Sequence, residues 1–371
     1  MNQFQTASIQ AAIRRVQPLD ATWMDAARQR QVRLTKPAGS LGTLERLHIQ
    51  LAGIQRRTLP QISRPAVLVV AADHGVADAD VSAYPKQVTA EMVRNFARGG
   101  AAINVLAADA GARLLVADLG IDWQGSPVPD GVVRLPQGPG TANLADGPAM
   151  SRRQAIASVE AGLQLARQLI DEGADLIALG EMGIGNTTAS AAMISVLADR
   201  PPRAVTGLGT GIDAARWERK VAIIEGALRR SGVTADDPLG VLAAVGGFEI
   251  GALAGAMIGS AAANVPVLLD GLIVGAASLL AVALCPAVQH YLIASHRSVE
   301  PGHRIVLELL ELEPLMDLGM RLGEGSGAAV ALHLIRLACK LPREMATFDE
   351  AGVSDKADAT ERIDVSAPRP S

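Results

Sequence analysis

The stretch AVLVVAADHG, residues Ala66–Gly75, is a continuous apolar run that ends in an acid, a histidine and a glycine. Runs of this kind are typical of parallel strands that are buried on both faces. Four later stretches repeat the pattern: RLLVADLG (Arg113–Gly120), ADLIALGE (Ala174–Glu181), VPVLLDG (Val265–Gly271) and HYLIASH (His290–His296). We therefore expect a sheet built mainly from parallel strands.

Helix-like segments separate these runs. They cover Thr89–Ala110, Arg152–Glu172, Thr187–Ala198, Arg216–Arg230, Phe248–Ala263 and Leu272–Ala283. Alternation of strands and helices predicts an α/β fold with a doubly wound, mainly parallel, Rossmann-like sheet. Right-handed crossovers place the carboxyl ends of all strands at one edge, where such proteins bind ligands.

The composition narrows the possible functions. The 371 residues are 49% hydrophobic and 19% charged, which excludes a disordered chain, a collagen-like repeat and a coiled coil. A net charge of −4 and only three Trp, two Tyr and four Phe argue against nucleic-acid binding. Two cysteines, Cys285 and Cys339, form neither a metal motif nor a disulfide framework, so a cytoplasmic location is expected.

The segment from Ile250 to Gln289 is apolar enough to suggest a membrane hairpin, because its only charge is Asp270. However, Asn264, Pro266 and Asp270 interrupt it near the middle, and it is rich in Gly and Ala. Buried core of the α/β fold is the favoured interpretation, and a membrane hairpin is the alternative.

Polar residues gather where the predicted strands end: Asp73, His74, Asp118, Glu181, Asp270, Ser295 and His296. Together they suggest a polar crevice. Each could instead be a helix cap or a turn former. Helices are also predicted near both chain ends, over 25–31 and 44–55 and over 301–313, 314–322 and 326–339.

Two glycine-rich segments precede predicted helices. LGEMGIGNTTASAAM (Leu179–Met193) allows close backbone approach, and its Asn and Thr residues offer donors at a helix N-terminus, which attracts anions. TGLGTGID (Thr206–Asp213) comes shortly before Lys220. Neither matches a Walker loop or a dinucleotide fingerprint. Phosphate binding is favoured, and simple tight turns are the alternative.

The stretch RLGEGSGAAVALHLI (Arg321–Ile335) places Glu324 between two glycines before an apolar helix. Burial there would raise the pKa of Glu324 and make it a proton acceptor near neutral pH. Equally, it could be a solvated first-turn glutamate that the helix dipole stabilises.

Taken together, these segments resemble the nicotinate-nucleotide–dimethylbenzimidazole phosphoribosyltransferase family. The resemblance covers about residues 15–348 and rests on KPAGSLGTLERL (Lys36–Leu47), AADHGVADADVSAYPKQVT (Ala71–Thr89), GPAMSR (Gly147–Arg152), LGEMGIGNTTASAAM, VGGFEIGALAGAMIGSA (Val245–Ala261), PVLLDG (Pro266–Gly271), YLIASHRS (Tyr291–Ser298) and MRLGEGSGAA (Met320–Ala329).

The resemblance implies a reaction and an architecture. The phosphoribosyl group of nicotinate mononucleotide would pass to 5,6-dimethylbenzimidazole or a similar base, giving α-ribazole 5′-phosphate and nicotinate with inversion at the anomeric carbon, during nucleotide-loop assembly of cobalamin. It also implies a homodimer and a small helical domain from both chain ends. We predict residues 1–60 as its N-terminal helices, 61–300 as the α/β domain, 301–348 as helices completing the small domain and the site, and 349–371 as a disordered tail.

The resemblance further implies roles for individual residues. Glu324 matches the catalytic base, and Glu181 matches a second acid of the site. Phosphate and ribose would meet Gly183, Gly185, Asn186, Thr187, Lys220 and Ser298. The wall around the base would include Tyr84, Pro85, Met92, Met182 and Leu322. No cofactor or metal is expected, because the chemistry needs none and the six histidines show no ligand spacing.

The base wall departs from the best-known family pattern at Tyr84, Met92 and Met182. Adaptable methionines and a tyrosine predict a hydrophobic pocket that accepts several flat bases. A non-catalytic nucleotide-binding relative of the same fold is the alternative function. The presence of both Glu181 and Glu324 argues against it, since a degenerate site would have no need of the two acids.

Overall fold

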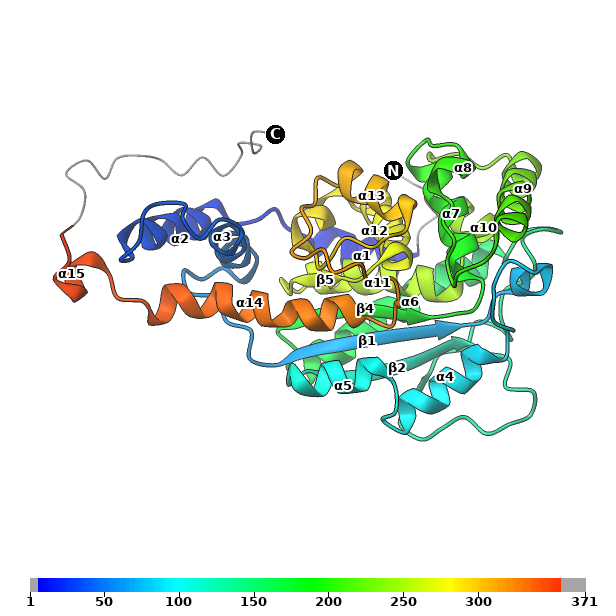
Figure 1. Cartoon of the computed structure of the whole chain (residues 1–371), viewed down its shortest axis with the longest axis horizontal. Helices are drawn as coiled ribbons and strands as arrows, with labels where there is room; N and C mark the ends of the chain where they lie inside the picture. The colour runs from blue at the N-terminus through cyan, green and yellow to red at the C-terminus, as the bar shows by residue number, and fades with distance from the viewer. Residues whose placement is uncertain (1–5, 355–371) are drawn as a thin grey trace. The chain divides into compact units, whose positions relative to one another are not determined.

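The computed structural model describes residues 6–354 (Figure 1). Contacts divide the chain into two compact units. Unit 1 comprises the described residues up to Gln17 together with Arg64–Ala331, and unit 2 comprises Pro18–Ser63 with the described residues from Leu332 onward. The disordered tail predicted over 349–371 is wrong at its start, because residues 349–351 belong to a helix that spans Phe348–Ala351, and its part beyond residue 354 lies outside the described residues.

The core of unit 1 is a six-stranded sheet in the order β3-β2-β1-β4-β5-β6. Every neighbouring pair is parallel. The strands are β1 (Pro65–Ala72), β2 (Arg113–Gly120), β3 (Val133–Arg134), β4 (Leu176–Met182), β5 (Val267–Leu269) and β6 (Leu292–Ala294). This order confirms the predicted doubly wound α/β fold. The two-residue strand β3 was not predicted.

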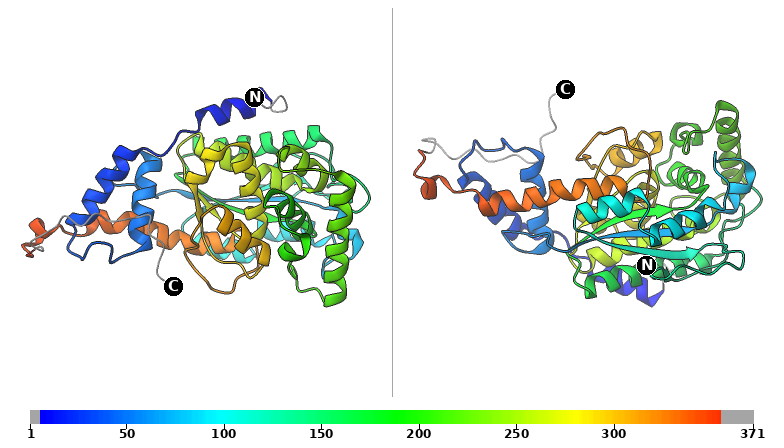
Figure 2. Two further views of the ribbon diagram at one scale, coloured as in Figure 1. Left: turned by 90° about the horizontal axis from the view of Figure 1, so that it is seen from above. Right: turned by 60° about the horizontal axis from the view of Figure 1, so that its bottom comes forward.

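The helices of unit 1 lie before, between and after these strands: α1 (Ala7–Arg15), α4 (Val88–Ala97), α5 (Ala102–Asp109), α6 (Arg152–Asp171), α7 (Asn186–Leu197), α8 (Pro202–Val205), α9 (Ala214–Ser231), α10 (Pro238–Val245), α11 (Phe248–Ala261), α12 (Leu272–Leu284) and α13 (Pro301–Leu309), with the 3-10 helices η1 (Gly75–Ala79) and η2 (Pro286–Tyr291). Helices α4 and α5 cover one face of the sheet, whereas α6 and α11 cover the other (Figure 2, right).

The tight packing of α6 against α11 explains the Gly- and Ala-rich sequence around residue 250. A side chain on Gly162 would overlap the carbonyl group of Ala252, and one on Gly255 would overlap that of Val159. These helices are therefore buried core. Within residues 6–354, no helix is long and apolar enough to cross a membrane.

Unit 2 joins residues from both ends of the chain. Its helices are α2 (Ala21–Arg33), α3 (Thr43–Gln55) and α15 (Phe348–Ala351), and α14 (Ser326–Glu344) begins in unit 1 and ends here. Arg30 Nε donates to the carbonyl oxygen of Pro342 at 2.9 Å, and Leu34 forms a β-bridge with Thr347. Contacts place α1 and residues 301–331 with the sheet, whereas the predicted ranges had assigned them to the small domain.

Two predicted helices differ in the structure. The segment Thr89–Ala110 is not one helix, because α4 ends before Gly99, which has a φ of +80°. The prediction of a helix over 314–322 is wrong. Met316 instead pairs with His296 beyond β6, and Arg297 donates its N–H to the Met316 carbonyl oxygen at 2.8 Å. Backbone pairing with the sheet edge satisfies hydrogen bonds that a helix would have made internally.

Candidate active site

A cavity of ≈ 580 Å³ opens in unit 1 where the strands end. The chain leaves β1 toward β2 and leaves β4 toward β5, so the sheet order reverses between β1 and β4. Crevices at this switch point are the usual ligand sites of doubly wound folds. The lining comprises Tyr84, Val88, Met92, Glu181, Met182, Gly183, Ile184, Asn186, Thr187, Gly209, Thr210, Gly271, Leu272, Ile273, His296, Ser298, Glu300, Arg321, Leu322, Gly323 and Glu324.

The turn that carries Glu324 has an unusual backbone. Gly323, Glu324 and Gly325 have φ values of +84°, +63° and +83°. A left-handed conformation is uncommon for glutamate and is kept only where the surroundings impose it. Here β4 supplies the constraint, because Gly180 lies directly against the Glu324–Gly325 peptide. A fixed turn therefore delivers Glu324 to the cavity.

Asp270, one residue after β5, fastens this turn from the other side. Its Oδ2 accepts the N–H of Gly325 at 3.1 Å, and its Oδ1 accepts the N–H groups of Gly327 at 2.8 Å and Ala328 at 3.2 Å. The carboxylate thus caps the start of α14 from a distant strand. Burial raises the pKa of Asp270 to about 7, although these backbone bonds oppose the rise.

Glu324 is buried, with 6% of its surface exposed. Its Oε2 is a buried atom with no hydrogen-bond partner among the described residues. Burial raises the pKa of Glu324 above its ordinary value, and a backbone hydrogen bond from Ile103 acts in the opposite direction. The carboxylate is therefore a desolvated acceptor with a free oxygen, the environment that a general base near neutral pH requires. The solvated alternative for this glutamate is not what the structure shows.

Glu181, at the end of β4, lies next to the same turn. A Cβ on Gly323 would come within 2.5 Å of Glu181 Oε1, and Glu181 Oε2 accepts a hydrogen bond from the Asn186 side chain. Burial raises the pKa of Glu181 to about 8, and the Asn186 bond lowers it. The nearby charges of Glu249, Asp270 and Glu324 raise the pKa of Glu181 further, so the titration of Glu181 depends on its acidic neighbours.

The other end of the cavity offers cationic and neutral donors. Lys220 on α9 is buried and donates from Nζ to Thr187 Oγ1 at 2.8 Å. Burial lowers the pKa of Lys220 to about 8, and the charge of Glu300 opposes this effect. Thr187 stands in the first turn of α7, whose 12 residues align peptide dipoles toward the cavity. This end is suited to an anion.

Ser298 is held by a buried histidine. Its backbone N–H donates to His303 Nδ1 at 3.1 Å. Burial lowers the pKa of His303 to about 3, so the ring is neutral and can accept this bond. The Ser298 hydroxyl accepts the N–H of Glu300 at 3.4 Å.

Ten of the thirteen residues predicted for the site line this cavity, and three do not. Lys220 is not part of the lining and is linked to it by its hydrogen bond to Thr187 Oγ1. Gly185 is the N-cap of α7, with a φ of +95°, and packs near Ala77. Pro85 accepts the N–H of Val88 with its carbonyl oxygen at 3.1 Å, at the start of α4.

Some polar residues at the strand ends have structural partners instead. Asp118 accepts the N–H groups of Gly120 and Ile121 and the Trp123 ring N–H, as the turn-forming alternative predicts. His74 pairs with Glu249 at 2.7 Å, and both side chains are fully buried. Among the described residues, no group of three acidic, histidine or cysteine side chains is arranged to hold a metal ion.

Several lining residues are not among the thirteen predicted for the site: Val88, Ile184, Gly209, Thr210, Gly271, Leu272, Ile273, His296, Glu300, Arg321 and Gly323. His296 belongs to the polar crevice that the strand ends predicted. Gly209 and Thr210 belong to the second glycine-rich segment, which gave a usable signal. Glu300 carries no motif of its own. Its place depends on the loop that returns to meet it, since Glu300 Oε1 accepts the N–H of Gly209 at 2.9 Å.

Comparison with known proteins gives a consistent result. A family model described as "Phosphoribosyltransferase" matches residues 16–353. A nicotinate-nucleotide–dimethylbenzimidazole phosphoribosyltransferase of Chloroflexus aurantiacus is 54% identical over 348 residues, which is 94% of this chain and 99% of that protein. The chain belongs to this phosphoribosyltransferase family. The Azotobacter vinelandii enzyme of the same name is 53% identical over 91% of this chain and 96% of its own length.

A solved structure supports the family assignment. The crystal structure of the Thermus thermophilus enzyme of that name matches 91% of this chain and 100% of its own, at 46% identity and a TM-score of 0.86. Identity at this level over nearly the whole length, with the same fold, makes the chain a phosphoribosyltransferase.

Proposed function

We propose that the protein transfers the phosphoribosyl group of nicotinate mononucleotide to a nitrogen of 5,6-dimethylbenzimidazole or a similar base. The products are α-ribazole 5′-phosphate and nicotinate, with inversion at the anomeric carbon. The observation that carries the proposal is the buried, unpartnered oxygen of Glu324 on the fixed turn at the cavity. A carboxylate so placed accepts a proton from a ring N–H.

The bond changes determine which groups are needed. The C–N bond between the anomeric carbon and nicotinate breaks, and its electron pair returns to the pyridine nitrogen, which loses its positive charge. No strong acid is therefore needed at the leaving group. The lone pair of the base nitrogen forms the new C–N bond on the opposite face, and the proton of the other ring nitrogen passes to Glu324.

Glu181 has a different role in the proposal. Its carboxylate lies beside the Glu324 turn and is held by Asn186. When ionised, it stabilises the positive charge that develops at the anomeric carbon, or it accepts a ribose hydroxyl. The elevated pKa of Glu181 makes the proportion of this ionised form sensitive to pH between 7 and 9.

The 5′-phosphate belongs at the cationic end of the cavity. Thr187 and Asn186 open α7, Gly183 allows close approach, and Lys220 and Ser298 complete the proposed set. Gly185 shapes the turn into the helix. Phosphate at a helix N-terminus backed by a lysine is a recurrent arrangement.

The base lies against Tyr84, Met92, Met182 and Leu322 in the proposal, with Pro85 shaping the loop. Tyr84 is 55% exposed, and Leu322 is 56% exposed. A wall with two exposed members and two adaptable methionines favours acceptance of several flat bases. Strict use of one dimethylated base would contradict this part of the proposal.

The deciding experiment incubates the protein with nicotinate mononucleotide and a panel of bases, namely 5,6-dimethylbenzimidazole, benzimidazole, adenine and a phenol. Products are identified by mass, and nicotinate is quantified by chromatography. Nicotinate release that depends on the base supports the transfer. Tight nucleotide binding without release would instead support a non-catalytic relative, which the retained acids do not favour. A cytoplasmic homodimer also belongs to the proposal and rests on the sequence resemblance and the cysteine content.

A further inference from the structure

One loop contacts both ends of the cavity. The 206–213 loop, which comprises residues 206–213 before α9, places Gly209 and Thr210 in the lining. These neighbours face different partners. Gly209 faces the residues proposed to bind the phosphate, whereas Thr210 faces the loop that presents Tyr84.

On the phosphate side, three polar groups lie around Gly209. Its N–H donates to Glu300 Oε1 at 2.9 Å. A Cβ on Gly209 would lie 3.0 Å from Thr187 Oγ1 and 3.4 Å from Lys220 Nζ. The Gly209 backbone therefore packs against the hydroxyl and the ammonium group that would receive an anion. An anion bound there would change the electrostatic environment of this peptide and of Glu300.

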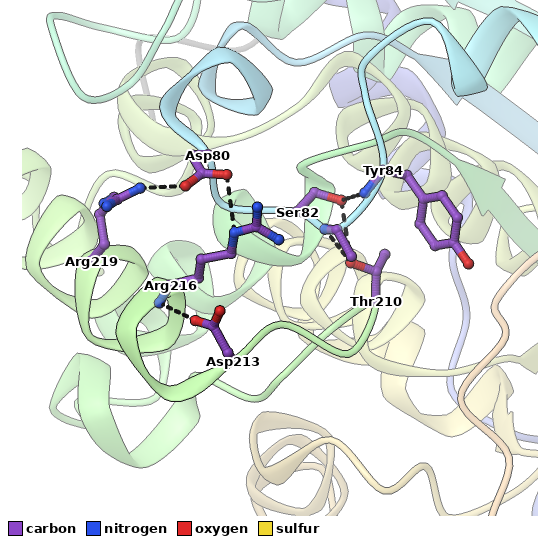
Figure 3. A network of polar contacts seen from close by, with 8 residues as sticks. Asp80, Ser82, Tyr84, Thr210, Asp213, Arg216 and Arg219 are labelled. Atoms are coloured by element: carbon purple, nitrogen blue, oxygen red, sulfur yellow. Dashed lines mark hydrogen bonds and ion pairs between the residues drawn. The ribbon is translucent and has the colours of Figure 1, made fainter.

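On the base side, Thr210 fastens the loop that carries Tyr84 (Figure 3). Its Oγ1 accepts the N–H of Ala83 at 2.9 Å and lies 3.2 Å from Ser82 Oγ. Ser82 Oγ in turn accepts the N–H of Tyr84 at 3.2 Å. The backbone position of Tyr84 is thus set through Ser82 and Thr210.

A second set of contacts ties the Tyr84 loop, which comprises residues 80–87 between η1 and α4, to α9, the helix that carries Lys220. Asp80 pairs with Arg216 Nε at 3.0 Å and with Arg219, both on α9 (Figure 3). Asp213 caps this helix by accepting the N–H of Arg216 at 2.8 Å. Contacts with α9, as well as contacts with the 206–213 loop, therefore hold the Tyr84 loop in place.

We propose that Thr210 is a positioning residue that couples nucleotide binding to base binding. An anion bound at Lys220 and Thr187 fixes the conformation of the 206–213 loop. Because Thr210 is hydrogen-bonded to the Tyr84 loop, the position of Tyr84, against which the base packs, is then fixed as well. This inference rests on the proposed function. It predicts synergy between the substrates, and thermodynamic reciprocity requires equal effects in both directions.

The test measures binding of 5,6-dimethylbenzimidazole by calorimetry, with and without saturating ribose 5-phosphate. This probe carries the sugar and the phosphate but has a hydroxyl in place of nicotinate, a poor leaving group, so no transfer to the base is expected. We expect ribose 5-phosphate to tighten base binding about fivefold or more, within the usual range of coupling. Thr210→Val keeps the shape and removes the acceptor, so the ratio of the two affinities should fall to near one. Thr210→Ser should restore it.

Ser82→Ala removes the same link from the other side at a half-buried position, so it should fold normally and also reduce the ratio. Glu218→Gln is the control, because it removes an exposed ion pair between α9 and Arg203 and leaves the Tyr84 loop untouched. An unchanged ratio in both Thr210→Val and Ser82→Ala would overturn the coupling. Turnover by the parent protein, measured in parallel, separates that result from failure of the proposed function.

Discussion

Gly180 of β4 lies so close to Glu324 that a Cβ on Gly180 would come within 2.5 Å of the Glu324 carbonyl carbon and 2.6 Å of its oxygen. Strand and turn thus meet backbone to backbone. The sheet itself fixes the position of Glu324, the proposed proton acceptor, because neither Gly180 nor the turn can shift without disturbing a buried strand.

Gly180→Ala should therefore displace the Glu324 turn. We expect overpacking to cost about 1–3 kcal/mol of unfolding free energy. Displacement of the Glu324 carboxylate should also lower kcat by about 100-fold. Steady-state kinetics and thermal unfolding measure the two effects. Gly226→Ala in α9 is the control, since nothing lies within 4 Å of the added carbon, and it should leave kcat unchanged. Parent-like kcat in Gly180→Ala would show that the turn position is unimportant.

Asp270→Asn should loosen the same turn from the other side. The amide keeps one acceptor oxygen but faces the N–H groups of the α14 start with donors of its own. We expect kcat to fall by about 10- to 100-fold, in the range seen when a group that orients a functional residue is removed. Asp237→Asn is the matched control, because the Asp237 carboxylate also caps a helix but does not line the cavity. It accepts the N–H of Gly240 at a distance of 3.1 Å. It should reduce stability only. Equal effects of the two variants on kcat would contradict the role of Asp270.

The lowered pKa of Lys220 predicts that kcat/KM for the nucleotide depends on pH. Burial lowers its pKa to about 8, so the side chain is cationic below that pH and neutral above it. The loss of positive charge should weaken phosphate binding and lower kcat/KM for the nucleotide as pH rises through about 8. Ionisation of Glu181 acts in the opposite direction over the same range, so the effect of Lys220 is measured as the ratio of the parent profile to that of a variant without the lysine. This profile reports groups of the free enzyme. Lys220→Met should raise KM for the nucleotide more than it lowers kcat and should remove that alkaline fall.

Arg229→Gln on the same helix provides the comparison for Lys220→Met, because the Arg229 side chain is 74% exposed. It should keep the parent KM and the parent pH profile. If Lys220→Met behaved in the same way, the phosphate would have to bind elsewhere.

Tyr84→Ala tests the base wall. Loss of the ring should raise KM for the base by about 5- to 10-fold, as expected for removal of aromatic contact of about 1 kcal/mol. KM for the nucleotide should change less. Steady-state kinetics with each substrate varied in turn separate the two constants. Unchanged KM for several bases would place the base away from Tyr84.

The long strands could be predicted from sequence because burial on both faces leaves a continuous apolar run. The observed β1 and β2 match the predicted runs closely, whereas β3 has only two residues and leaves no such pattern. Residues 314–322 show why spacing alone is insufficient. Their apolar residues suggested a helix, but the backbone bonds at the edge of β6 determine their conformation.

The candidate site shows the same division. Glu324 could be singled out from the sequence by its place between two glycines, whereas its left-handed backbone is visible only in the structure. The three N–H groups that Asp270 accepts come from residues more than 50 positions away, so only the folded chain could reveal its role. Glu300 and Thr210 likewise act through partners distant in sequence.

The most direct test of the account is the kcat of Glu324→Gln, measured with nicotinate mononucleotide and 5,6-dimethylbenzimidazole between pH 5 and 9. In the parent protein, kcat should decline as pH falls through the raised pKa of Glu324, because a protonated carboxyl cannot accept the ring proton. The variant should lose about 100-fold or more of kcat, the usual contribution of a general base, while its affinity for the nucleotide stays at the parent level. Parent-level turnover by Glu324→Gln with an unchanged pH profile would contradict the central claim.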